Sequence, residues 1–235
     1  MKSIHVLDRR LELLQHEDGF KTSIDAVFLA SSCRAKTGQH VLDLGCGIGS
    51  AGLCLAKRIE GIHLTGLDIQ GDQIETARCN ARKNNLEAEF ITGDVRSYDA
   101  APFDHIICNP PYNDAGAHLR SPSAAKATAM GHDETSLQDW LDAGCKLLKH
   151  GGSLNMIHQT AKVDIIIKGL KNRFGAVEII PLYPKAGKAA NRVIIRAKRN
   201  SKAPASIHPG LILHEDDGSY TSAAEKILRE MQPLL

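Results

Sequence analysis

Short apolar runs alternate with amphipathic stretches through most of the 235-residue chain. Runs rich in Val, Ile and Leu are typical of buried strands, and apolar residues with a helical period, such as Leu53, Ala56 and Ile59, predict helices between them. We expect strands at residues 39–43, 63–68, 88–92, 103–108, 153–157, 176–182 and 192–197. We expect helices at residues 24–32, 48–59, 71–84, 136–148 and 162–173.

Strands that alternate with helices favour βαβ units and a mainly parallel sheet. The last two expected strands are separated by a loop with Pro184 and Gly187, which is too short for a parallel crossover. We therefore predict an α/β fold: a Rossmann-like, doubly wound sheet flanked by helices, with an antiparallel last strand.

Three segments lie outside this alternation. Residues 1–37 are an N-terminal extension, and residues 201–235 are a C-terminal extension with a short helix. Residues 113–134 are a long polar insert rich in Ala, Ser and Gly, which is typical of a lid or a binding loop. The alternating part, residues 38–200, is the expected main domain.

Composition and charge exclude several classes of protein. The chain is 43% hydrophobic and 24% charged, as in soluble globular proteins, and a net charge of +2 does not by itself imply a polyanion partner. No apolar run reaches membrane-spanning length, and the start of the chain does not resemble a signal peptide. The six cysteines include no CxxC pair, and the eleven histidines lack metal-ligand spacing. We expect a cytoplasmic protein with free thiols, no membrane contact and no metal, and a monomer is favoured over an oligomer.

The most informative motif is Asn109-Pro110-Pro111-Tyr112, which follows the expected strand at 103–108. Neither proline can donate a ladder hydrogen bond, so the motif ends the strand in a stiff turn. Ligands bind at the carboxyl ends of strands in open α/β sheets. The Asn109 oxygen and the Pro110 carbonyl can accept two N–H bonds while the Tyr112 ring stacks. The motif therefore predicts a site for a flat group bearing NH2, with an ordinary strand-ending turn as the alternative.

A glycine loop between the first expected strand and the helix after it predicts a cofactor site. Gly45, Gly47 and Gly49 allow a tight turn and a close approach of the backbone to a ligand. Their GxGxG spacing differs from the GxGxxG of pyrophosphate binders, and Asp43 just before them suits a positively charged ligand. S-adenosyl-L-methionine carries an ammonium and a sulfonium group, so it is the expected cofactor, with a dinucleotide as the alternative.

Acidic residues also end the next two expected strands. Asp68 can bind ribose hydroxyls. Asp94 can accept a hydrogen bond from the amine of the cofactor's adenine, while Val95 offers a backbone N–H to the ring. Each acid alone is compatible with a helix cap or a strand end, but their recurrence at successive strand ends favours one site. The expected cofactor-binding residues are Asp43, Gly45, Cys46, Gly47, Gly49, Asp68, Ile69, Asp94, Val95 and Asn109.

These motifs resemble the class I S-adenosylmethionine-dependent methyltransferases, specifically the amino-methylating branch with (D/N/S)PP(Y/F). The resemblance covers residues 38–200 and implies a seven-stranded sheet of order 3-2-1-4-5-7-6, with the seventh strand antiparallel. Segments 8–15, 19–30, 187–195 and 211–214 are similar to the bacterial tRNA(Val) adenine-N6 methyltransferase family.

The closer resemblance implies methylation of the exocyclic amine of an adenine beside the anticodon, at position 37 of tRNA(Val). In relatives the N-terminal extension lies against the cofactor, so Thr22, Ser23 and Asp25 are expected cofactor contacts. A helix start capped by Thr22 or Ser23 is the alternative. Catalysis by positioning, without a covalent intermediate, is expected. The expected catalytic residues are Asn109, Pro110 and Tyr112.

Basic residues late in the chain suggest how RNA is held. Residues 185–202 carry seven Lys or Arg residues and no acid. Such a cluster can neutralise phosphates, although solvated edge strands also carry lysines. The polar insert adds two cations near the proline turn. The expected substrate-binding residues are Pro111, Tyr112, Arg120, Lys126, Lys185, Lys188 and Arg192.

Other activities remain compatible with these motifs. Methylation of a protein glutamine amide shares Asn-Pro-Pro-Tyr but usually comes with an additional N-terminal helical domain. Guanine-N2 methylation of ribosomal RNA more often has Phe in place of Tyr112. DNA adenine methylation, small-molecule O-methylation and non-catalytic RNA binding fit the motifs less well.

Overall fold

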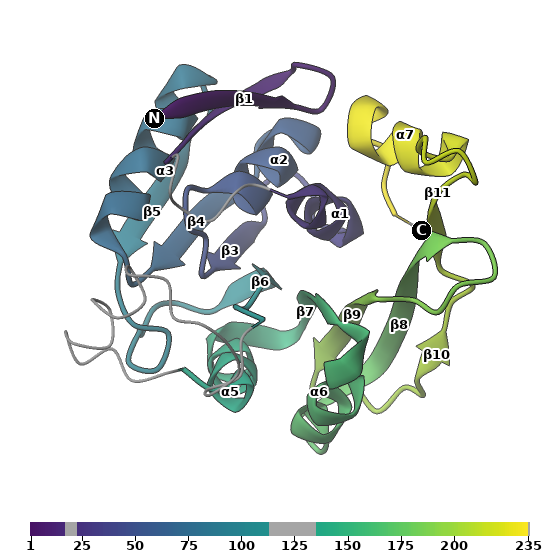
Figure 1. Ribbon diagram of the computed structural model, residues 1–235. Helices are drawn as coiled ribbons and strands as arrows, with labels where there is room; N and C mark the ends of the chain where they lie inside the picture. The colour runs from purple at the N-terminus through teal and green to yellow at the C-terminus, as the bar shows by residue number, and fades with distance from the viewer. Residues whose placement is uncertain (17–22, 113–134, 235) are drawn as a thin grey trace, which may run out of the picture.

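The computed structural model describes residues 1–16, 23–112 and 135–234 (Figure 1). A nine-stranded sheet has the order β10-β8-β9-β7-β6-β3-β4-β5, with β11 also paired to β8. Its strands are β3 (His40–Leu44), β4 (His63–Asp68), β5 (Ala88–Thr92), β6 (Phe103–Cys108), β7 (Leu148–Gln159), β8 (Phe174–Lys185), β9 (Arg192–Arg199), β10 (Ser206–Ile207) and β11 (Leu211–His214).

The central sheet has the predicted topology. β3 lies parallel to β4 on one side and to β6 on the other, and β5 and β7 continue the parallel array. β9 is antiparallel to both of its neighbours, β7 and β8. Counted in chain order, the seven strands from β3 to β9 give the order 3-2-1-4-5-7-6 with the last one antiparallel, which confirms the prediction.

The sheet is wider than the predicted seven strands. β10 and β11 come from the C-terminal extension, and both pair in parallel with β8. Leu211 and Leu213 of β11 are buried in the same apolar cluster as Ile227 of the helix that follows, α7 (Ser222–Glu230). The extension therefore covers the edge of β8, and covered edges discourage pairing with other chains.

Helices cover both faces of the sheet (Figure 1). The further helices are α1 (Ile24–Ser32), α2 (Ser50–Arg58), α3 (Gly71–Lys83), α5 (Leu137–Leu147), the short 3₁₀ helix η1 (Thr160–Lys162) and α6 (Val163–Leu170). Buried Phe28 and Leu53, from α1 and α2, belong to the apolar cluster of one face. Leu141 and Ile166, from α5 and α6, belong to the cluster of the other face. Two separate apolar layers thus hold the sheet.

The N-terminal extension contains a β-hairpin that the sequence-based prediction omits. β1 (Lys2–Val6) pairs with β2 (Leu11–Gln15), and Leu11 and Leu13 are fully buried. Two asparagines of α3 bind the backbone of β2: Asn80 Oδ1 lies 2.7 Å from the Leu14 nitrogen, and Asn84 Oδ1 lies 2.9 Å from the Glu12 nitrogen. The hairpin is therefore attached to the helix that follows β4.

Several element boundaries differ from the prediction for reasons of backbone geometry. α2 begins at Ser50 rather than at residue 48, because Gly47 and Gly49 have φ angles of +52° and +83°, outside the helical region. β7 begins at Leu148 rather than at 153, directly after α5, and Gly151 within it has a φ of +76°.

Within the described ranges, the longest apolar helices fall short of what a bilayer crossing requires. The same residues contain no group of three His, Cys, Asp or Glu side chains placed to hold a metal ion. All six cysteines are free thiols, as predicted.

Candidate active site

The predicted site residues meet at one edge of the sheet because the strands that carry them are parallel. Leu44, at the end of β3, pairs with Leu67 of β4 and with Cys108 of β6. The glycine loop, Asp68 and Asn109 therefore start from adjacent positions. β5, which precedes Asp94, ends at the same edge.

The glycine loop is held against β4, and its first glycine has no room for a side chain. The backbone N–H groups of Gly45 and Cys46 both donate to the Leu67 carbonyl, at 2.8 and 2.9 Å. A Cβ on Gly45, whose φ is +72°, would lie 2.3 Å from Cη2 of Trp140. Only glycine fits there, and the loop presents bare backbone to a ligand.

Asp68 joins the end of β4 to the glycine loop. Its Oδ2 accepts from the Gly47 nitrogen at 2.8 Å, and its Oδ1 accepts from the Gln70 nitrogen at 2.9 Å. Burial raises the pKa of Asp68, although these N–H groups oppose the shift. A carboxylate offers about four acceptor positions, so sugar hydroxyls can still bind. The next residue, Ile69, is 38% exposed and offers an apolar surface beside them.

Asp43 faces the first turn of α2. Its Oδ2 accepts from the Gly52 nitrogen at 2.7 Å, and the residue is buried. Burial raises its pKa to about 7, with a further contribution from the negative charge of Asp68, while the Gly52 N–H opposes the shift. A nearby cation would favour the ionised form of this carboxyl group.

Asp94 already has a basic partner. Arg96 Nε lies 3.1 Å from each carboxylate oxygen of Asp94, and Arg96 Nη2 lies 2.6 Å from Oδ2. An adenine amine at Asp94 would therefore share the carboxylate with Arg96 or replace it. Val95 is buried in the apolar layer of α5 and α6.

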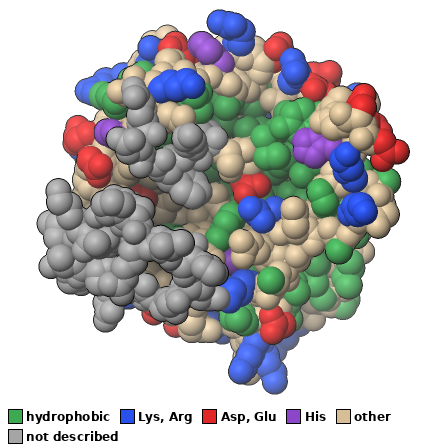
Figure 2. Space-filling view, viewed as in Figure 1, with side chains coloured by type: hydrophobic (Ala, Val, Ile, Leu, Met, Phe, Trp, Pro, Cys, Tyr) green, Lys and Arg blue, Asp and Glu red, His purple; other side chains and the backbone are tan. Residues whose placement is uncertain are grey.

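The proline turn is linked to α1 and β9 through Tyr112. The Tyr112 hydroxyl oxygen lies 2.9 Å from Asp25 Oδ2 and 2.9 Å from Asn109 Oδ1. Arg192 Nε lies 3.1 Å from the same Asp25 oxygen. Figure 2 shows acidic and basic side chains in contact near the middle of this face. Pro110 is buried, whereas Pro111 is exposed.

The Tyr112 ring has a cation on one face. The guanidinium carbon of Arg192 lies 4.7 Å from the ring centroid, and the His158 ring meets Tyr112 edge-on, with centroids 5.1 Å apart. Burial raises the pKa of Tyr112, and the charge of Asp25 and its hydrogen bond add to the shift. Stacking of a substrate base on Tyr112 would thus use the other face or displace Arg192.

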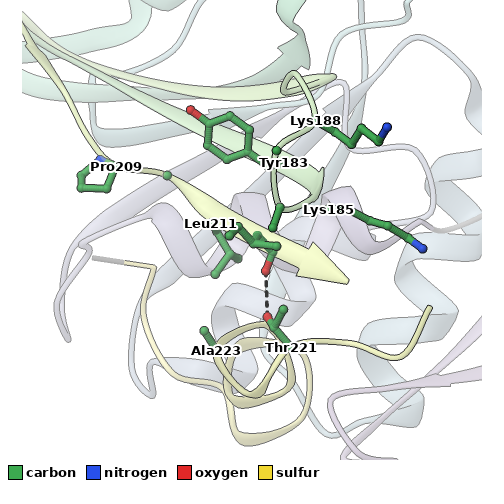
Figure 3. Close-up of a pocket in the computed structure, with 11 residues that line it drawn as sticks. Tyr183, Lys185, Lys188, Pro209, Leu211, Thr221 and Ala223 are labelled. Atoms are coloured by element: carbon green, nitrogen blue, oxygen red, sulfur yellow. Dashed lines mark hydrogen bonds between the residues drawn. The ribbon is translucent and has the colours of Figure 1, made fainter. Parts of the chain in front are cut away.

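The predicted basic segment does not form one patch. Lys185 and Lys188 border a groove of about 580 Å³ between the carboxyl end of β8 and the start of β11, beside Tyr183 (Figure 3). Arg192 lies on Tyr112 instead. Arg196 is 4% exposed and binds Glu178 and the Ser32 carbonyl, so it is unavailable to a phosphate.

Some predicted contacts are not visible at the site. Thr22, Arg120, Lys126 and the insert 113–134 lie outside the described residues. Ser23 is the N-cap residue of α1, but its side chain makes no capping hydrogen bond.

Three residues of this edge were missing from the prediction. Trp140 lies against Gly45, Arg96 binds Asp94, and His158 packs against Tyr112. Trp140 is the single tryptophan of the chain, and Arg96 is two residues after an acid, but neither is a specific signal. His158 carries no sequence signal that we can identify.

The residues at this edge fit S-adenosylmethionine. A Cβ on Gly47 would meet nothing within 4 Å, so the loop backbone is open to the close approach of a ligand there. Asp68 and Ile69 combine a hydroxyl acceptor with an exposed apolar side chain. The buried Asp43 carboxyl group complements a cationic ligand. The fold and this edge together define the class, an S-adenosylmethionine-dependent methyltransferase.

Residues 21–183 match the family model described as methyltransferase small domain, and the chain belongs to this family. A relative named tRNA1(Val) (adenine(37)-N6)-methyltransferase, from Aeromonas hydrophila, is 29% identical over 206 residues, which cover 86% of this chain and 85% of the relative.

Solved structures are also similar. A predicted O-methyltransferase from Agrobacterium tumefaciens has a TM-score of 0.71 and 27% identity, covering 86% of this chain and 94% of that one. A tRNA (uracil-54, C5)-methyltransferase from Pyrococcus abyssi, in complex with S-adenosyl-L-homocysteine, has a TM-score of 0.53 and 26% identity, covering 82% of this chain and 43% of that one.

Proposed function

We propose that the chain transfers a methyl group from S-adenosylmethionine to the N6 amine of an adenine in tRNA, at position 37 of tRNA(Val). The observation that carries the proposal is the Asn109-Pro110 turn at the end of β6, adjacent to the glycine loop. Its amide and carbonyl oxygens suit an amine with two N–H groups. The name of the Aeromonas hydrophila relative supports adenine and tRNA as the substrate.

The chemistry requires positioning more than acid–base groups. S-adenosylmethionine, when bound, supplies an electrophilic methyl group. The adenine amine is a poor nucleophile because its lone pair is delocalised into the ring. Asn109 Oδ1 and the Pro110 carbonyl accept its two N–H bonds and turn the nitrogen toward tetrahedral geometry. The proton released after transfer goes to water.

The other predicted residues have proposed roles on the cofactor side of this amine. The backbone of Gly45, Cys46, Gly47 and Gly49 approaches the cofactor, and Ser23, at the start of α1, is a further contact. Asp68 binds the ribose, and Ile69, Asp94 and Val95 surround the adenine ring. These assignments rest on the geometry described above and on the class of the protein.

The tRNA contacts are proposed for the same edge of the sheet. Tyr112 stacks on the target base, and Pro111 is exposed beside it. Lys185 and Lys188 bind phosphates along the groove in Figure 3, and Arg192 lies between that groove and the target base. The target nucleotide would be swung out of its loop to reach Asn109. We further propose a cytoplasmic protein that acts as a monomer.

The rival reactions are separable in one assay. The protein is incubated with S-adenosylmethionine labelled in the methyl group and, in parallel, with total tRNA, ribosomal RNA, DNA and protein. The products are digested and analysed by mass spectrometry. We expect labelled N6-methyladenosine from tRNA. Label in a ribose or another hydroxyl would favour O-methylation, the activity that the name of the Agrobacterium tumefaciens protein indicates, and label in glutamine would favour protein methylation.

A further inference from the structure

The Tyr112 hydroxyl group lies between two acceptors and has one proton to donate. Its oxygen is 2.9 Å from Asp25 Oδ2 and 2.9 Å from Asn109 Oδ1. Arg192 binds the same Asp25 oxygen, at 3.1 Å from Nε. The hydroxyl group can therefore donate its proton to the Asp25 carboxylate or to the Asn109 amide oxygen, but it cannot make a full hydrogen bond to both at once.

The carboxylate is the stronger acceptor of the two. Asp25 forms a salt bridge with Arg192, and the two side chains are 12% and 28% exposed. Hydrogen bonds to an ionised acceptor are about twice as strong as neutral ones. The raised pKa of Tyr112, caused first by burial, keeps the hydroxyl group protonated. The proton therefore points to Asp25.

We propose that Asp25 is a positioning residue that holds the Tyr112 proton away from the Asn109 oxygen. This rests on the proposed function, in which that oxygen binds the substrate amine. A hydroxyl donated to Asn109 Oδ1 would occupy one of its two lone pairs and weaken it as an acceptor for the amine. Asp25 prevents this competition and fixes the ring through its hydroxyl group, and Arg192 fixes Asp25 in turn.

This role differs from the cofactor contact that the resemblance implies for Asp25. The oxygen Oδ2 of Asp25 is engaged by Tyr112 and Arg192 in the structure. The three residues come from α1, the turn after β6 and β9, so the N-terminal extension is part of the amine site.

The first test uses the full-length protein without ligands. The Tyr112→Phe change is made in the wild type, in Asp25→Ala and in Asn109→Ala, and unfolding is followed in urea. In the wild type we expect Tyr112→Phe to raise the unfolding equilibrium constant about 10-fold. That increase should largely vanish in Asp25→Ala and persist in Asn109→Ala. An increase that persists in Asp25→Ala and vanishes in Asn109→Ala would overturn the proposal.

The second test is single-turnover methyl transfer to tRNA. We expect Asp25→Ala to slow the reaction about 2- to 10-fold, the equivalent of one neutral hydrogen bond. Adding Tyr112→Phe should restore the rate to that of Tyr112→Phe alone, because the competing donor is gone. A double variant slower than Asp25→Ala would overturn the proposal. Asp142→Ala removes another arginine-paired carboxylate, distant in the chain on α5, and serves as the control.

The two tests separate this inference from the proposed function. If the wild type methylates no RNA while Tyr112 still couples to Asp25 in the unfolding measurements, the proposed substrate is wrong and the placement of the proton stands. If RNA is methylated but Tyr112 couples to Asn109 instead, the role of Asp25 is wrong.

Discussion

Asp68 Oδ2 lies 2.8 Å from the backbone nitrogen of Gly47, so the end of β4 holds the loop that follows β3. The other carboxylate oxygen accepts from Gln70 at 2.9 Å. One side chain thus sets the shape of the glycine loop and lies where the ribose of the cofactor is proposed to bind. This double role makes Asp68 a sensitive point of the cofactor site.

Asp68→Asn should weaken S-adenosylmethionine binding by at least about 10-fold. An amide can accept from only one of the two backbone N–H groups and turns its own NH2 toward the other, so the loop shifts as well as the ribose contact. Isothermal titration calorimetry measures the effect. Asp164→Asn, on the exposed first turn of α6, is the matched control and should leave the affinity unchanged.

Gly45→Ala should lower the free energy of unfolding more than an alanine substitution at another glycine with positive φ. Gly38 has a φ of +81° and open space around its Cβ position, so Gly38→Ala reports the backbone strain alone, about 1–2 kcal/mol. At Gly45 the clash with Trp140 should add about 1–3 kcal/mol. Urea unfolding of both variants gives the comparison, and equal losses would mean that Trp140 moves aside without cost.

Asp43 should make the stability of the protein depend on pH. Its pKa is raised to about 7 in the folded state, against about 3.9 in an unfolded chain. Between these two pKa values Asp43 is protonated in the folded state and ionised in the unfolded state. The free energy of unfolding that protonated Asp43 contributes is therefore lost as pH rises from about 4 to 7. Relative to Asp43→Asn, the wild type should lose up to about 4 kcal/mol across this window and then level off. Parallel pH curves for the two proteins would contradict the assignment.

Lys188→Glu should weaken tRNA binding and reduce its salt dependence, because a phosphate contact at the groove becomes a repulsion. The slope of the logarithm of affinity against the logarithm of salt concentration should fall in magnitude by about 1 for the lost contact. Filter binding at several salt concentrations measures it. Lys171→Glu, at an exposed position after α6, makes the same charge change as a control. Equal effects of the two variants would assign the loss to net charge alone.

The central strands could be predicted because each buried strand is a short apolar run, whereas the order of the sheet followed from the resemblance to class I methyltransferases. The loop before Arg192 is too short for a parallel crossover, so it predicted that the last strand of the domain is antiparallel. The hairpin of the N-terminal extension could also have been predicted, because apolar and polar residues alternate at Leu11, Glu12 and Leu13. Its strands have only five residues each, however, and the extension does not show the strand–helix alternation of the main domain. β10 and β11 are shorter still and depend on the edge of β8 for their conformation.

The motifs predicted that the candidate site residues meet at one edge of the sheet, as they do, but not which side chains contact one another there. Asp25 and Arg192 are 167 residues apart in the chain, and no spacing rule predicts that both meet Tyr112. The proximity of Trp140 to Gly45 depends in the same way on how α5 packs against the sheet. The basic segment was misleading as a patch because buried Arg196 pairs with Glu178, on the neighbouring strand.

The most direct test of the whole account is the single-turnover rate of methyl transfer to tRNA by Asn109→Ala, measured together with the Kd of S-adenosylmethionine. We predict a rate about 100-fold below the wild type, because the amine loses one of its two acceptors, and a Kd changed by less than about threefold. A variant that methylates tRNA at nearly the wild-type rate would contradict the role of the Asn109 oxygen and, with it, the proposed mechanism.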